Sequence, residues 1–576
     1  MFDLIIRNGL VCDGTGRDAY RADIGVRDGR IAAIGDLSAQ TAKSEYDAHG
    51  KTVAPGFIEP HSHADLSILF FPSMESYLRQ GVTTVVGGNC GHSFAPVGDE
   101  VYRAAIVDQR VMFHAKPSYF ESTSFLLPLE KAKEGLREEY GIEMDWSSFS
   151  DYIDKVNSLP PDANIVPLAG YSAIRAAVMG MDCLREATPE ELDRCEALTR
   201  QCMDEGAFGL SSGTDPQYIP GPFATDEEMV RMLKVVAERG GVFASHTRNV
   251  TRDGRPDRME GYREMLRQAR AAGVRAHVSH VHTLGMGATP EACAQAARDT
   301  LRYFEEEAAN GLDLSFDVIP SPYSMDFTVP YFATFLRPFV LMSGSRQQLA
   351  RNLQVPDFCK MVRLVIENGM YPLLDPKEIT SVYSIVTVSR HKNPAHLGKN
   401  LAQYARELGR DPLDLTLELF AEDCDMCGAM ALPGMDEANK LLCEHPLAIP
   451  CADGISGSKD ISFGLNEDID MMQNPMGLSF MIRWMLLHGK PRFEDTIRQI
   501  TGFVAERFNI PQRGRLEEGY FADIVVLDRG RLKSHDRDEN PLQYPEGIDL
   551  VVVNGVETVR DGAMTGAHAG RMLRKN

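Results

Sequence analysis

The middle of the chain alternates eight short apolar runs with helix-like stretches, and this alternation restricts the possible folds more than any other feature. The runs suit strands that are buried on both faces, and the stretches between them have helical periodicity. One stretch begins with a capping box formed by Thr188 and Glu191. The pattern predicts an α/β fold, a distorted (β/α)8 TIM barrel with insertions. A doubly wound open sheet is the alternative, although it would not need eight strands. The runs are "TVAPGFIEPHSH", "GVTTVVGGNCG", "NIVPLAG", "AFGLSSG", "GVFASHTRN", "VRAHVSHVH", "LDLSFDVIP" and "PLAIPCADG".

Both ends of the chain are rich in short β-like segments. Asn8-Gly9 near the start and Asn554-Gly555 near the end are dipeptides typical of hairpin turns. We therefore expect the two ends to form one small β-sandwich domain. The predicted division is residues 1–53 and 506–576 for the sandwich and 54–505 for the barrel, with insertions at about 99–145 and 325–445.

Composition narrows the classes of partner. The formal charge of −22 argues against a nucleic-acid partner, because phosphate binding needs a basic face. No apolar run is long enough to predict a membrane span, and the first residues do not resemble a secretory signal. Eleven cysteines without regular spacing are typical of reduced thiols, so a cytoplasmic location is expected. The aromatic first insertion is expected to be a lid or a subunit contact, which is compatible with a homo-oligomer.

Histidine, cysteine and aspartate recur where the predicted strands end. Catalytic residues of such barrels lie at the C-terminal ends of the strands, and these residue types are the ligands that zinc prefers. A set of this size could hold two ions that share a bridging water, or one strong and one weak site. The sequence thus predicts a centre with one or two Zn²⁺ ions. The candidate ligands are His61, His63, Cys90, His246, His280 and Asp453.

Alternation along the strands assigns faces to neighbouring side chains. Arg248 shares a face with His246, and His282 shares one with His280, so both are expected to face the pocket. His277 falls on the opposite face of its strand and is expected to lie against the surrounding helices. Gly88 and Gly91, which flank Cys90, indicate a tight turn with a close backbone approach.

The chain resembles the amidohydrolase superfamily and, within it, the N-acyl-D-amino-acid deacylases (D-aminoacylases). The similarity spans nearly the whole chain, and its segments occur in the same order. It is carried by "GFIEPHSHAD", "GVTTVVGGNCGHSFAPV", "PLAGYSAIRAAVMG", "EGAFGLSSGTDPQYIPG", "ASHTRN", "VSHVH", "CADG", "RGRLEEGYFADIVVLD" and "VVVNGVETVRDGAMTGAHAGRMLR".

The resemblance implies a zinc-dependent amide hydrolase. It implies that Cys90, His246 and His280 hold a tighter metal, and that His61, His63 and Asp453 hold a second, weaker or absent one. The fourth run has no lysine, and the family's cysteine takes the bridging role that a carboxylated lysine has in other superfamily members. Asp453 is implied as the general acid/base, and His61 and His63 could instead donate hydrogen bonds to the oxyanion.

Three departures from the family pattern concern recognition of the substrate carboxylate. The family lysine two positions beyond the strand-six histidine is His282 here, and "DxYPY" becomes "DVIPS". The arginine of the "HPR" motif has no counterpart, and Lys459 is the nearest cation. Tyr218 matches a family tyrosine near the substrate. The candidate substrate-binding residues are Arg248, His282, Tyr218 and Lys459.

The sequence leaves three hypotheses open. The first is a zinc deacylase acting on a small-molecule amide, either an N-acyl-D-amino acid or a bulkier, less charged compound. The second is a cyclic-amide hydrolase of the hydantoinase or dihydroorotase type, which the missing lysine disfavours. The third is a non-catalytic assembly protein on the same fold, which would be expected to lose metal ligands.

Overall fold

The computed structural model describes most of the chain, and the statements below concern the described residues. These are residues 1–69, 72–103, 126–214, 221, 223–248, 257–283, 290–320, 323–326, 336–367, 386–431, 436–459, 475–535 and 543–575.

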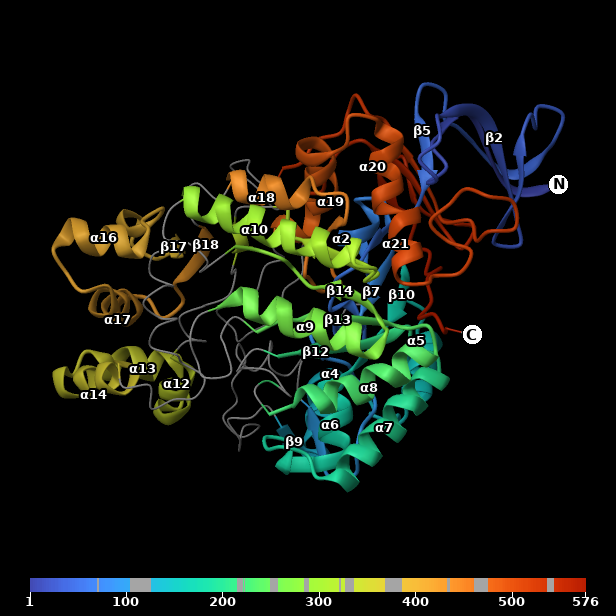
Figure 1. The fold of residues 1–576 in the computed structure, drawn as a ribbon. Helices are drawn as coiled ribbons and strands as arrows, with labels where there is room; N and C mark the ends of the chain where they lie inside the picture. The colour runs from blue at the N-terminus through green and yellow to red at the C-terminus, as the bar shows by residue number, and fades with distance from the viewer. Residues whose placement is uncertain are drawn as a thin grey trace.

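Eight parallel strands form the barrel, which confirms the predicted fold (Figure 1). Three of them pair in the order β10–β7–β6, and the others continue from β11 through β12, β13, β14 and β15 to β19. β11 resumes one residue after β10, and a bridge between Ser62 and Gly454 joins the first strand to the last. The strands are β6 (Phe57–Glu59), β7 (Val82–Gly87), β10 (Asn164–Pro167) with β11 (Ala169–Gly170), β12 (Gly209–Gly213), β13 (Val242–His246), β14 (Arg275–Val278), β15 (Leu314–Val318) and β19 (Ala448–Pro450).

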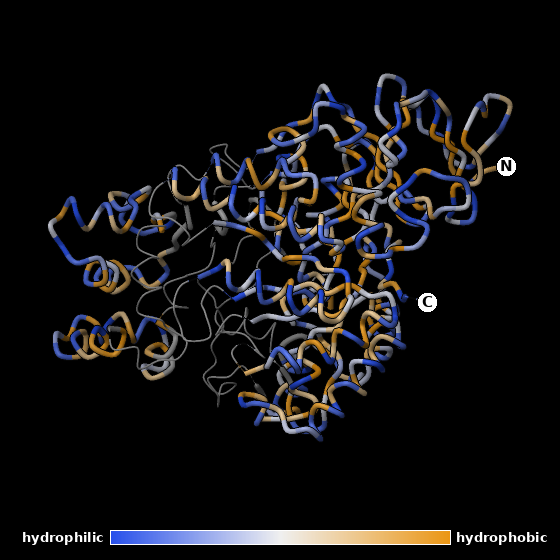
Figure 2. The backbone as a smooth tube through the Cα atoms, viewed as in Figure 1, coloured by the Kyte–Doolittle hydropathy of each residue, from blue (hydrophilic) through white to orange (hydrophobic). Residues whose placement is uncertain are grey.

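Amphipathic helices cover the outside of the barrel (Figures 1 and 2). The predicted capping box is present, because Thr188 Oγ1 accepts from the backbone N–H of Glu191 and the Glu191 carboxylate accepts from that of Thr188. The helices outside the second insertion are α1 (Ala64–Ser67), α2 (Glu75–Leu78), α4 (Leu129–Tyr140), α5 (Phe149–Ser158), α6 (Tyr171–Met179), α7 (Pro189–Asp204), α8 (Asp226–Glu238), α9 (Arg258–Ala272), α10 (Pro290–Ala309), α19 (Pro475–His488), α20 (Phe493–Ile500) and α21 (Gly502–Arg507). At the end of that insertion, α18 (Asp436–Cys443) packs against α10.

Apolar side chains fill the barrel at the N-terminal end of its strands. Alternate residues of the strands, such as Val86, Ala244 and Ile449, pack in one cluster with Val504 of α21 and with Phe508, which follows that helix. Because this cluster closes the N-terminal end of the barrel, polar chemistry is confined to the opposite, C-terminal end.

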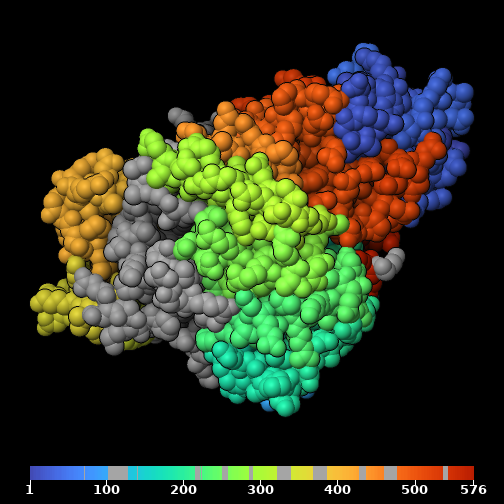
Figure 3. All heavy atoms as spheres, in the orientation of Figure 1, coloured from blue at the N-terminus to red at the C-terminus, as the bar shows by residue number. Residues whose placement is uncertain are grey.

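The two chain ends join in one sheet, as the sequence predicts. β5 (Thr52–Pro55) pairs with β1 (Phe2–Val11) on one side and with β20 (Ile524–Leu527) on the other. Figure 3 shows the first and last parts of the chain, blue and red, packed side by side. The remaining strands of this sheet are β2 (Tyr20–Arg27), β3 (Arg30–Gly35), β4 (Ala42–Asp47), β21 (Ile548–Val553), β22 (Val556–Arg560) and β23 (Ala563–Met564).

The tail that follows this sheet, residues 565–575, returns to the barrel. The backbone N–H of Ile165 in β10 donates to Arg571 O at 2.8 Å, and that of Leu573 donates to Ile165 O at 2.7 Å. A parallel bridge joins Ile165 to Met572. The tail thereby supplies backbone hydrogen bonds to a barrel strand.

The second insertion has a hydrophobic core of its own, which includes Leu349, Leu401 and Phe420. Its helices extend away from the terminal sheet (Figure 1). The elements are strands β16 (Tyr323–Asp326), β17 (Val386–Arg390) and β18 (Cys427–Ala431), and helices α12 (Arg337–Ser343), α13 (Arg346–Leu353), α14 (Pro356–Glu367), α16 (Leu401–Leu408) and α17 (Pro412–Glu422).

The first insertion is described in two parts that flank residues 104–125. A hairpin of β8 (Val101–Arg103) and β9 (Leu126–Pro128) leads into α4. The aromatic segment that suggests a lid or a subunit contact lies mainly outside the described residues. Within the described ranges, no helix combines the length and the apolar character that a membrane crossing requires.

Candidate metal centre

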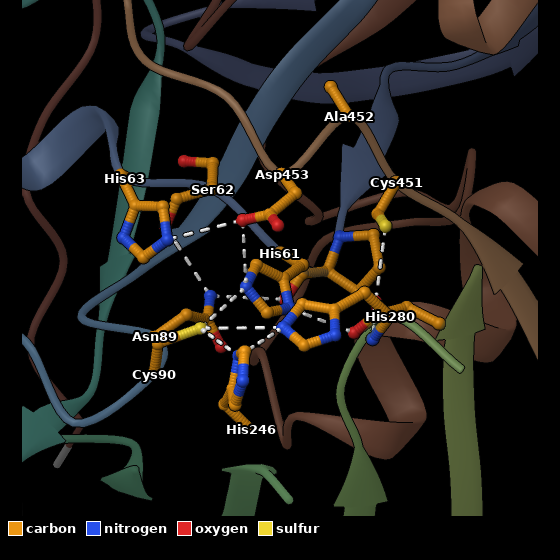
Figure 4. Close-up of polar contacts among 12 residues, drawn as sticks. His61, Ser62, His63, Asn89, Cys90, His246, His280, Cys451, Ala452 and Asp453 are labelled. Carbon is orange, nitrogen blue, oxygen red and sulfur yellow. Dashed lines mark hydrogen bonds and ion pairs between the residues drawn. The ribbon is translucent and has the colours of Figure 1, made fainter. Parts of the chain in front are cut away.

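The six candidate ligands meet at the C-terminal end of the barrel (Figure 4). They form two overlapping groups in which the potential ligand atoms lie within 4.8 Å of one another, and Cys90 belongs to both. A thiolate between two such groups can bridge two ions or complete either site alone. One group is His61, His63, Cys90 and Asp453, and the other is Cys90, His246 and His280.

The contacts around Cys90 are short. Its Sγ lies 3.3 Å from His61 Nε2, 3.6 Å from His280 Nε2 and 3.8 Å from His246 Nδ1. The last two nitrogens are 2.8 Å apart. Nitrogen and sulfur atoms thus converge from four strands on a volume the size of one or two ions.

Asp453 completes the group that contains His61 and His63. Its Oδ1 lies 3.2 Å from His61 Nε2 and 3.2 Å from His63 Nε2. His61 and His63 follow the end of β6, and the bridge from Ser62 to Gly454 brings their segment beside the one that carries Asp453. The barrel closure itself therefore assembles this group.

Three of the candidate ligands have left-handed backbone conformations. Cys90 has φ 55°, His280 has φ 32° and Asp453 has φ 51°. Such conformations are unfavourable for residues other than glycine and concentrate at functional sites. As expected from the sequence, the Cys90 turn also needs glycine, because Gly88 has φ 78° and a Cβ there would lie 2.1 Å from Leu168 O.

Burial and charge oppose each other in the centre. Burial disfavours ionisation of Cys90, but His61, His246 and His280 lower the pKa of its thiol well below the ordinary value. Burial likewise raises the pKa of Asp453, but His61 and His63 outweigh that effect and lower it well below the ordinary value. A thiolate and a carboxylate among imidazoles are the donor set that a divalent zinc ion requires.

Asp317 in β15 orients the centre, although the sequence analysis did not select it. Its Oδ2 lies 3.2 Å from His61 Nδ1 and 2.8 Å from His277 Nε2, and its Oδ1 accepts from the backbone N–H of His280 at 2.6 Å. Cys451 Sγ also donates to Oδ1, at 3.1 Å. An aspartate within a fully buried strand was the available signal.

The predicted orientation of His277 is wrong. Its side chain bonds to Asp317 and Ser315 and packs against Phe508, which lies in the cluster that fills the barrel. β14 ends at Val278, and the left-handed backbone at His280 breaks the alternation on which the prediction relied. His280 reaches the centre because of this turn.

The candidate substrate-binding residues have different surroundings. Arg248 is buried and paired with Glu264 of α9, with Nη2 3.1 Å from Oε1. His282 is partly buried, and its ring centroid lies 6.5 Å from that of His280. Lys459 is exposed, and its backbone N–H donates to Tyr544 Oη at 2.9 Å. Tyr218 lies outside the described residues.

A parallel eight-stranded barrel that carries histidines, a cysteine and an aspartate at its C-terminal end defines a metal-dependent hydrolase of the amidohydrolase type. A D-aminoacylase from Alcaligenes xylosoxydans xylosoxydans is 30% identical over 576 residues, which cover 100% of this chain and 98% of that protein. The chain belongs to the D-aminoacylase family. No protein-family model matches the sequence.

Solved structures agree with this assignment. The crystal structure of a D-aminoacylase, described as defining a novel subset of amidohydrolases, has a TM-score of 0.67 and 26% identity, with 100% of both chains covered. An N-acyl-D-glutamate deacylase from Bordetella bronchiseptica, solved with zinc and a phosphonate mimic of the tetrahedral intermediate, has a TM-score of 0.69 and 25% identity over 100% of both chains. The recognised resemblance is therefore confirmed.

Proposed function

We propose that the chain uses zinc to hydrolyse the amide bond of N-acyl-D-amino acids. The observation that carries this proposal is the position of Cys90, which belongs to two groups of ligand atoms at the C-terminal end of the barrel. The activities for which two relatives are named, D-aminoacylase and N-acyl-D-glutamate deacylase, support the substrate class.

The residues present fit zinc by number, type and charge. Cys90, His246 and His280 would hold one ion, and His61, His63 and Asp453 would hold a second, with Cys90 shared. When zinc is bound, it supplies a water whose pKa is lowered to about 7 and a positive charge that polarises the amide carbonyl.

The chain's own groups then move the protons. Asp453 is ionised, so its carboxylate accepts the proton of the attacking water and returns it to the leaving nitrogen. His61 and His63 donate hydrogen bonds to the developing oxyanion when the second position is empty. The amide C–N bond breaks, and a carboxylic acid and a free amine form.

Of the substrate-binding candidates, His282 is the one whose position beside His280 supports contact with the substrate. Arg248 would first have to leave Glu264, so we assign it no contact with the substrate.

An assay with a panel of amides tests the proposal. N-acetyl-D- and N-acetyl-L-amino acids, an aryl amide and a hydantoin are incubated with the zinc-loaded protein and with protein stripped by a chelator. We expect turnover of the D-amino-acid derivatives, its loss with the metal and its return with added zinc. Activity that survives complete removal of zinc, or a preference for hydantoin, contradicts the proposal.

A further inference from the structure

Arg258 is a buried cation that the centre described above does not use. It is the first residue of α9, and only 8% of its surface is exposed. Its neighbour Asp257 uses its carboxylate to cap the helix and accepts from the backbone N–H of Glu260 at 3.3 Å. No ion pair to Arg258 occurs among the described residues, and its Nε has no hydrogen-bond partner there.

Arg248 provides an internal comparison. It is also buried, but Glu264 neutralises it through contacts to both Nε and Nη2. Burying a guanidinium without a partner carries a large desolvation cost, so buried charges are normally paired. Among the described residues, Arg248 has an anionic partner and Arg258 has none. An anionic ligand bound from solution would neutralise the charge of Arg258.

The position of Arg258 places that anion beside the metal centre. Tyr262, one helical turn along α9, donates from its hydroxyl to the backbone carbonyl of His282 at 3.3 Å. His282 is two residues from the candidate ligand His280. The side chain of Arg258 also forms a hydrogen bond with that of Tyr262, so Tyr262 links Arg258 to the backbone of His282. His282 therefore lies close to Arg258 and to the candidate ligands.

We propose that the guanidinium of Arg258 binds the α-carboxylate of the substrate and so restricts the enzyme to N-acyl amino acids with a free carboxylate. The proposal rests on the proposed function of the same site and names the residue that recognises its substrate class. The free Nε–H and a neighbouring Nη–H form the planar fork that binds a carboxylate through two parallel hydrogen bonds. Because lysine lacks this fork, Arg258→Lys is not a conservative change here.

A substrate pair that differs only in the carboxylate tests the assignment. N-acetyl-D-leucine and N-acetyl-D-leucinamide release the same acetate, which is measured for both. In Arg258→Met, the ratio of kcat/KM for the acid to that for the amide should fall about 10- to 100-fold, mainly through KM for the acid. Arg258→Lys should give a smaller fall. A ratio equal to that of the wild type in both variants overturns the proposal.

Arg263→Met is the matched control. Arg263 lies on the same helix, but its side chain is 49% exposed, and its Nη1 lies 3.8 Å from Glu260 Oε2. Arg263→Met should leave kcat/KM for both substrates and the zinc content unchanged. Arg258→Gln keeps a polar side chain without the charge, and it should reproduce the fall in the ratio if Arg258→Met fails to fold. An equal loss for acid and amide in folded, zinc-loaded variants indicates a structural role and overturns the proposal.

Wild-type behaviour separates this inference from the proposed function. If the wild type cleaves the leucinamide as well as the acid, amide hydrolysis stands and the role of Arg258 is wrong. If the wild type cleaves neither, the proposed substrate class is wrong, and calorimetry with N-acetyl-D-leucine on zinc-loaded protein decides the inference. Binding that is lost in Arg258→Met supports the carboxylate site, and equal binding in both proteins overturns it.

Discussion

His61 Nδ1 lies 3.2 Å from the Oδ2 of Asp317, so the carboxylate holds the imidazole with its other nitrogen, Nε2, directed at Cys90 and Asp453. A hydrogen bond of this kind fixes the tautomer and the orientation of a metal-binding histidine. The same carboxylate holds the left-handed backbone at His280. One aspartate therefore orients a histidine from each of the two ligand groups.

Asp317→Asn should weaken zinc binding about 10- to 100-fold, because the amide orients His61 less firmly and carries no charge. Competition with a chromophoric chelator measures the affinity. Asp313→Asn is the control, since Asp313 lies just before the same strand and pairs with the surface residues Arg275 and Arg507. Equal zinc affinity in Asp317→Asn and the wild type would show that Asp317 does not support the centre.

Cys90→Ser should lower the zinc affinity of both ligand groups, because Cys90 is the residue that they share. His246→Ala should lower that of one group only. Zinc per chain after dialysis, measured by elemental analysis, distinguishes the two results. Cys359→Ser, at a half-exposed cysteine in the second insertion, should retain full zinc content. Full zinc content in Cys90→Ser would remove the cysteine from the centre.

Asp453→Asn should reduce kcat about 100-fold or more, because the amide cannot accept the proton of the attacking water. KM should change little, and the ion held by Cys90, His246 and His280 should remain. Steady-state kinetics together with zinc analysis check both parts. A kcat within tenfold of the wild type would assign the proton transfer to another group.

Glu191→Gln should destabilise the protein by about 1 kcal/mol at pH 7, because it removes the negative charge that pairs with Arg185 and favours the N-terminus of α7. The hydrogen bond from Arg185 lowers the pKa of Glu191 from 4.5 to about 2. The unfolded state therefore takes up this proton first as the pH falls, and the stabilisation is complete above about pH 5 and decreases toward pH 2.

Thermal unfolding of both proteins at pH 7 and pH 4 measures this change. The difference in Tm should be smaller at pH 4. Glu190→Gln, an exposed neighbour in the same turn, should produce a smaller shift at pH 7. A difference that grows on acidification would contradict the assigned direction of the pKa shift.

The barrel and the candidate ligands could be predicted because both follow local rules. Buried parallel strands appear as apolar runs, and the residues at their C-terminal ends meet at one rim. His61, Cys90, His246 and Asp453 are placed correctly by this rule without any knowledge of side-chain contacts.

The remaining features depend on tertiary structure. The orientation of His277 was missed because the backbone at His280 is left-handed, and no glycine at that position indicates such a turn. Arg248 and Arg258 look alike in the sequence, and only the fold places Glu264 beside the first and leaves the second without an anion among the described residues. The domain boundaries at 53 and 505 remain predictions.

The tail along β10 determines when the protein can finish folding. Asn157 donates a hydrogen bond to the backbone carbonyl of Met572, 415 positions further along the chain, and Met572 also forms a β-bridge with Ile165. During translation the strands that carry His61 and Cys90 leave the ribosome long before residues 570–575 are made. Until then β10 can pair with β7 on one side, but the backbone groups of Ile165 that the tail binds remain an open edge. This edge of the barrel is therefore completed only after the tail has been synthesised, not as the barrel strands emerge.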